Sequence, residues 1–247
     1  MNKLMMTCLS ILALSSTAVL AAAEGEWGYE GDTGPEKWGQ LDTDFSVCDT
    51  GRLQSPFDIK ANFETSLPAL EFNYSAAVLD VTRDANGVTV AIPAGQTMTV
   101  GDDVYDLLQY HFHTPSEYHI NGQAFPMSLH LVHKRQSDGA LGVLGVMIES
   151  GAANAAIDKI WVKLPANKGN FLSTSVKINP ADLLPDTHRY MRFSGSLTTP
   201  PCSEGVNWHM LESPISLSAK QIIAFKGITK MNARPLQPAN NRLVISE

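Results

Sequence analysis

The sequence carries little positive charge. Among its 247 residues, 18 lysines and arginines stand against 25 aspartates and glutamates, which gives a formal net charge of −7 at pH 7. Proteins that bind nucleic acids need clustered basic side chains, because these side chains displace counterions from the phosphates. The sequence has no such cluster, so the composition argues against a nucleic-acid partner.

Long apolar runs are also scarce. The longest one, residues 4–20, follows Met-Asn-Lys and ends in three alanines before Glu24. A basic start, an apolar middle and a small-residue end form the pattern of an export signal. An uncleaved membrane anchor is the alternative, although the run is short and is interrupted by Ser and Thr. We therefore predict a signal peptide at 1–23 and one domain at 24–247, periplasmic in a bacterium or otherwise secreted, without stable membrane insertion after signal removal.

Only three cysteines occur in the chain. Cys8 falls inside the predicted signal, so Cys48 and Cys202 remain as an even pair in an oxidising compartment, where they predict one disulfide. That bond would close a loop of about 150 residues, for which the chain-entropy model gives about 4 to 5 kcal/mol of stabilisation. Two free buried thiols are the alternative.

The sequence also lacks internal repeats and any linker rich in Pro, Gly or Ser, which favours a single domain. β-Branched or alternating apolar segments bounded by Gly, Asn or Asp predict strands at 78–82, 88–92, 105–112, 128–133 and 141–148. Apolar residues spaced by three and four predict helices at 154–164 and 218–225, the second capped by Ser216 or Ser218. Residues 27–49 show no period and predict an irregular arm lying on the core.

Four of the seven histidines fall in two short clusters. Residues two apart on a strand share a face, so His111 and His113 point the same way. His130 supplies a third imidazole if its strand lies beside the first, whereas His133 points away. Three neutral imidazoles with an open fourth position form a catalytic zinc site. For the His-x-His spacing alone, chance or a hydrogen-bonded core pair is the alternative.

Longer segments around these histidines resemble one protein family. The segments are QSPFDI at 54–59, QYHFH at 109–113, SE at 116–117, LHLVH at 129–133, GSLTTPPCSE at 195–204 and the run at 232–242. Together they resemble the α-carbonic anhydrases over nearly the whole mature chain. The resemblance implies a predominantly β, single-domain fold with a central, largely antiparallel twisted sheet, a few surface helices and one zinc ion at the base of a cone-shaped cleft. It implies a lyase that reversibly hydrates carbon dioxide to bicarbonate and a proton, with zinc-bound hydroxide as the nucleophile. For the assembly we expect a monomer or a homodimer.

The resemblance also assigns roles by position. The implied zinc ligands are His111, His113 and His130. Thr198 would accept a hydrogen bond from the hydroxide and donate its own towards Glu117, and Thr199 would help to position bicarbonate. Gln109 and the main-chain carbonyl of Asn232 would hold the remaining nitrogens of the first two ligands.

An apolar wall is implied beside the metal, because carbon dioxide is small, apolar and held by exclusion of water. The implied wall residues are Val132, Val143, Leu197, Val206 and Trp208. Ordinary core packing is the alternative for these side chains.

Two positions depart from the family pattern. Ser128 stands where a glutamate normally orients the third ligand, and the loss of such a partner weakens metal binding or activity about 10- to 100-fold. Val88 stands where fast members carry a histidine that shuttles protons, so the proton would leave through water or buffer. A catalytically silent member that serves as a binding module is the competing hypothesis. An unrelated zinc hydrolase is not supported, because the sequence has no His-Glu-x-x-His motif.

Overall fold

A computed structural model describes residues 27–83, 87–165 and 169–247. The predicted signal peptide at 1–23 lies outside these residues. Within them, no helix is both long enough and apolar enough to cross a membrane.

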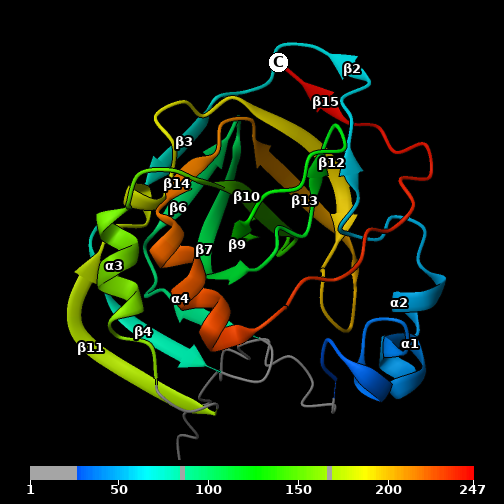
Figure 1. Cartoon of the computed structure of the whole chain (residues 1–247). Coiled ribbons are helices and arrows are strands. Elements are labelled where there is room, and N and C mark those ends of the chain that lie inside the picture. Colours follow the sequence, from blue (N-terminus) through cyan, green and yellow to red (C-terminus); the bar gives the residue numbers. More distant parts are fainter. Residues whose placement is uncertain (1–26, 84–86, 166–168) are drawn as a thin grey trace, which may run out of the picture.

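The described residues form one large twisted sheet, a separate parallel sheet of two strands and a few helices (Figure 1). The strands are β1 (Asp58–Ile59), β2 (Phe63–Glu64), β3 (Leu70–Asn73), β4 (Ala77–Arg83), β5 (Val88–Ala91), β6 (Thr97–Val100), β7 (Asp103–His113), β8 (His119–Ile120), β9 (Met127–Arg135), β10 (Leu141–Ser150), β11 (Asn170–Ile178), β12 (Tyr190–Ser196), β13 (Glu204–Leu211), β14 (Ile215–Leu217) and β15 (Ile245–Ser246). The helices are η1 (Gly31–Thr33), α1 (Trp38–Leu41), η2 (Thr43–Phe45), α2 (Val47–Thr50), α3 (Ala155–Trp161), η3 (Pro180–Leu183) and α4 (Ala219–Thr229).

The large sheet has 13 strands among the described residues. Ten of them follow the order β11-β4-β5-β7-β9-β10-β13-β12-β15-β2. Of the other three, β14 pairs with β10, β6 pairs with β7, and β3 pairs with β6. Most neighbours are antiparallel, but β10 pairs in parallel with both β13 and β14, and β15 pairs in parallel with β2. The predicted fold class is therefore confirmed, with a sheet that is mixed rather than purely antiparallel.

All five predicted strands are present, as β4, β5, β7, β9 and β10. Both predicted helices are present with shifted ends: α3 stops earlier than expected, and α4 continues four residues further. Asn154 caps α3 by accepting the main-chain N–H groups of Ala156 and Ile157. Ser218 caps α4 in a capping box with Gln221, which satisfies donors that the first helical turn leaves free. Ser216 lies in β14 and is not the cap.

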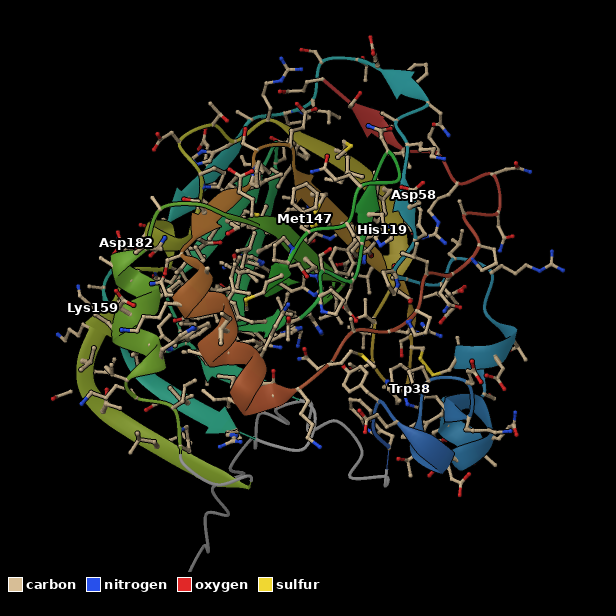
Figure 2. The ribbon with its side chains drawn as sticks, viewed as in Figure 1. Trp38, Asp58, His119, Met147, Lys159 and Asp182 are labelled. Atoms are coloured by element: carbon tan, nitrogen blue, oxygen red, sulfur yellow. A yellow bond between two sulfur atoms is a disulfide. The ribbon has the colours of Figure 1, made fainter. Side chains whose placement is uncertain are left out.

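The arm at 27–49 is more regular than the sequence suggested. It contains the short helical turns η1, α1, η2 and most of α2, which are too short to show an apolar period. Trp38, labelled in Figure 2, is fully buried there beside a disulfide between Cys48 and Cys202. The predicted disulfide therefore joins the arm to the segment before β13.

The two faces of the central strands belong to different apolar clusters. Along β9, Leu129 and Leu131 point into a large core that α3 and α4 cover. Val132 points instead into a second cluster, which also contains Val143 and Trp208. Because side chains alternate along a strand, His130 shares the face of Val132. The second cluster therefore borders the site described next.

Candidate active site

Three imidazoles converge at the centre of the sheet. His111 and His113 come from one face of β7, and His111 pairs directly with His130 on the neighbouring strand β9. Each of the three offers one nitrogen, and these nitrogens lie within 4.8 Å of one another. Burial, and then the neighbouring imidazoles, keep the pKa values of His111 and His130 well below the usual range. Neutral imidazoles are the form that binds a metal.

Two of these histidines are held through their other nitrogen. Nδ1 of His111 lies 2.9 Å from Oε1 of Gln109, and Nδ1 of His113 lies 2.7 Å from the carbonyl oxygen of Asn232. These contacts leave both Nε2 atoms available. Nε2 of His113 is buried and makes no hydrogen bond in the described part of the chain, although Oε2 of Glu117 lies 3.3 Å from it. A cluster of this kind, which offers three nitrogens and is largely buried, fits zinc.

His130 is oriented differently. Its Nδ1 lies 3.7 Å from Oε2 of Glu117, which is itself 3.3 Å from Nε2 of His113, so Nδ1 faces the cluster. Its Nε2 is buried and has no hydrogen-bond partner among the described residues. The hydroxyl of Ser128 accepts a long hydrogen bond, 3.4 Å, from the main-chain N–H of Glu117. Ser128, which stands where the family normally has a glutamate, therefore contacts the main chain of Glu117.

Glu117 is fully buried beside the histidines. Its Oε1 accepts the main-chain N–H of Arg234 at 3.0 Å. Burial raises the pKa of the Glu117 carboxyl, whereas His113, the Arg234 N–H and the Thr198 hydroxyl favour its ionised form. Thr198 is buried as well, and Thr199 is half-buried at the next position.

The side chains proposed as an apolar wall lie together. Val132, Val143, Val206 and Trp208 belong to one buried cluster, against which the half-buried Leu197 packs. The ring of Trp208 meets His130 edge-on at a centroid distance of 5.0 Å. The wall therefore reaches the third histidine directly.

The loop at 197–203, which carries Thr198 and Thr199, is held by contacts at both of its ends. Within it, the Cys202 N–H donates to the Thr199 carbonyl at 2.9 Å, next to the disulfide. Ser55 and Ser196 exchange two hydrogen bonds, of 2.9 and 3.1 Å. A side chain at Gly195 would meet the Ser55 hydroxyl at 2.5 Å, so only glycine permits this approach.

Val88 does not face the histidines. It is fully buried in the large core, on the same face of β5 as Val90. The opposite face carries Thr89, which pairs with His111, and the exposed Ala91, which pairs with Gln109. The first strand positions that face the site are therefore Thr89 and Ala91.

Sequence reasoning missed Arg234 and Tyr118. Arg234 donates to Glu117 through its main chain, while its guanidinium binds Gln54, Ser55 and the carbonyl of Cys48. Tyr118 packs edge-on against Trp208. Arg234 lies within the run at 232–242 that resembles the family, and Tyr118 directly follows Glu117. Their places in these motifs were the only signal in the sequence that could have indicated a role at the site.

Comparison with known proteins agrees with this geometry. A family model described as eukaryotic-type carbonic anhydrase matches residues 33–247. Carbonic anhydrases from Neisseria gonorrhoeae and Pectobacterium carotovorum are 41% and 38% identical to the chain; the alignments cover 96% of it in both cases, and 95% and 98% of those relatives. The structure of the α-carbonic anhydrase of Thermovibrio ammonificans with sulfanilamide matches with a TM-score of 0.87 at 36% identity, over 90% of this chain and 99% of that one. The chain therefore belongs to the eukaryotic-type (α) carbonic anhydrases, zinc-dependent lyases that act on carbon dioxide and bicarbonate, and its three-histidine cluster is able to hold the metal.

Proposed function

We propose that the chain reversibly hydrates carbon dioxide at a zinc ion held by His111, His113 and His130. The observation that carries this proposal is the convergence of three buried or half-buried imidazoles, two of which are fixed through their second nitrogen. When bound, zinc supplies a Lewis acid that lowers the pKa of a water molecule to about 7, as is known for carbonic anhydrase.

Glu117 and Thr198 would orient the attacking oxygen. The ionised Glu117 carboxylate can only accept a hydrogen bond, so the Thr198 hydroxyl donates to it. The Thr198 oxygen can then only accept a hydrogen bond from its other neighbours. Thr198 would then accept a hydrogen bond from the attacking oxygen, which would keep its proton and direct a lone pair towards the substrate. The Arg234 N–H on Oε1 supports the ionised carboxylate and fixes its direction.

The apolar cluster would hold the substrate. Carbon dioxide offers little to hydrogen-bond, so a wall that excludes water favours it over water. Thr199, which is half-buried and follows the wall residue Leu197 by two positions, would position bicarbonate before it leaves. Gln109 and Asn232 would keep the imidazoles of His111 and His113 in place. Ser128 would support the main chain at Glu117 and would not orient His130.

The site of action would be outside the cytoplasm. A signal peptide at 1–23 would be removed from a domain at 24–247, and the protein would act in the periplasm as a monomer or homodimer. Support comes from the sequence pattern at the start of the chain, from the Cys48–Cys202 disulfide, which suits an oxidising compartment, and from the bacterial relatives.

Two measurements on one preparation test this function. We expect close to one zinc per chain and stopped-flow carbon dioxide hydration that is lost when His130 is changed to Ala. His119→Ala is the matched control, because His119 is half-buried on β8 and is not part of the cluster. Zinc that never binds, or that binds without hydration above background, would favour the binding-module hypothesis instead.

A further inference from the structure

A cavity that no histidine lines lies between residues 57–62 and the C-terminal segment 236–244. It has a volume of about 400 Å³. The two segments run side by side on the right of Figure 1, where the Asn62 N–H donates to the Val244 carbonyl. Asp58, at the edge of this cavity, is labelled in Figure 2.

Arg242 lines this cavity and is only 5% exposed. Its Nη2 donates to the carbonyl of Gln54 at 2.9 Å, and its guanidinium carbon lies 4.2 Å from the centre of the Phe57 ring. Its Nε and Nη1 are buried and have no hydrogen-bond partner in the described part of the chain. A buried cation with two unmet donors is costly, so the arrangement calls for an acceptor.

The other charges at the cavity do not supply that acceptor. Asp58 lines it, but one carboxylate oxygen accepts the Gly122 N–H at 2.7 Å and the other is 3.1 Å from Nζ of Lys60. Among the side chains that line the cavity, Lys60 and Asp58 cancel each other, so Arg242 leaves one excess positive charge there. The remaining walls are partly apolar, with Phe57, Leu236 and Val244 among them.

We propose that this cavity binds a small organic monocarboxylate. The carboxylate accepts from Nε and Nη1 of Arg242, and the apolar body lies against Phe57, Leu236 and Val244. Since both nitrogens are covered, entry requires rim side chains to move; the Lys60 side chain is 69% exposed and Leu236 is 40% exposed. The site is separate from the histidine cluster, so the inference does not depend on the proposed function.

The test uses the zinc-loaded protein with 4-bromobenzoate as the probe. We expect anomalous bromine density in the cavity of soaked crystals, with the carboxylate on Arg242, and saturable binding by calorimetry. Ala61→Trp fills the cavity without changing Arg242 and should weaken this binding at least about tenfold, or by 1.4 kcal/mol. Ala153→Trp, at an exposed alanine outside the cavity, is the matched control and should bind like the parent protein.

Two results would overturn the proposal. One is bromine density only near the histidine cluster, with ordered water alone on Nε and Nη1 of Arg242. The other is equal affinity in Ala61→Trp and Ala153→Trp. Arg242→Lys adds a second readout, because it keeps the charge but loses the forked donors; if it folds, it should also lose the probe.

Discussion

Nδ1 of His113 lies 2.7 Å from the carbonyl oxygen of Asn232, 119 residues further along the chain. The Asn232 side chain fixes this contact, because its oxygen accepts the Thr114 N–H at 2.8 Å and its nitrogen donates to the Phe112 carbonyl at 2.9 Å. Asn232, which follows α4, thus forms hydrogen bonds with the residues on both sides of His113 at the end of β7. The ligand's orientation depends on a contact between distant parts of the sequence.

Changing Asn232 to Ala should therefore loosen the metal. The main-chain acceptor of His113 stays in the chain, and the Asn232 N–H still donates to the Thr114 carbonyl at 3.1 Å, but the two side-chain hydrogen bonds that also hold this position are lost. Partners of this kind affect metal affinity about 10- to 100-fold, so we expect zinc release to a chelator to accelerate within that range. Asn73→Ala, at an exposed position of β3, is the control. Equal release rates in the two variants would contradict the proposed role of Asn232.

Ser128→Glu should slow zinc loss to a chelator. Nε2 of His130 has no hydrogen-bond partner among the described residues, and a carboxylate there would raise the basicity of the ligand. Ser128→Ala is the companion variant, because it removes only the 3.4 Å contact to the Glu117 N–H. Faster or unchanged loss from Ser128→Glu, in a variant as stable as the parent, would refute this role for position 128.

Hydration at saturating substrate should depend on buffer concentration, since neither Thr89 nor Ala91 can carry a proton. We expect imidazole to raise the maximal turnover. Ala91→His should make turnover less dependent on buffer, because Ala91 is exposed and pairs with Gln109 on the site face of β5. Val88→His should fail to do so and should lower stability, because it places an imidazole in the large core. Indifference of the parent protein to buffer would sink this prediction.

The alternation of strands explains what the sequence could predict. It placed His111 and His113 on one face and turned His133 away, and in the structure His133 bonds to Tyr74 at 2.6 Å on the other side of the sheet. It could not predict that β9 pairs with β7 in the register that sets His111 opposite His130. The pairing of strands depends on tertiary packing, and the local periodicity of the sequence carries no information about that packing. The same holds for the short turns of the arm and for Arg234.

Replacing both Cys48 and Cys202 by Ala should lower the free energy of unfolding by about 2 to 5 kcal/mol, the usual cost of losing a native disulfide. Hydration should also fall, because Cys202 donates to the Thr199 carbonyl and the bond ties this loop to the arm. Urea unfolding under non-reducing conditions measures the first effect, and stopped-flow hydration of the folded variant measures the second. Unchanged hydration would show that the loop keeps its shape without the arm.

Acid should destabilise the protein through two buried histidines outside the three-histidine cluster. Burial lowers the pKa of His133 to about 3, and burial together with Arg192 lowers that of His209 to about 3. In the unfolded chain each pKa is about 6.5, so between these values the unfolded state binds protons that the native state does not. The free energy of unfolding should therefore be unaffected by these groups above pH 6.5 and should fall below it, by up to about 1.4 kcal/mol per pH unit for each histidine.

His209→Leu isolates this effect. Both ring nitrogens of His209 are without a hydrogen-bond partner among the described residues, and the side chain is fully buried beside Tyr190, so an apolar replacement removes no hydrogen bond. The stability lost between pH 7 and pH 5, measured by urea unfolding, should be smaller in His209→Leu than in the parent protein. If His209→Leu loses as much stability as the parent over this range, the protonation that drives acid unfolding occurs elsewhere in the chain.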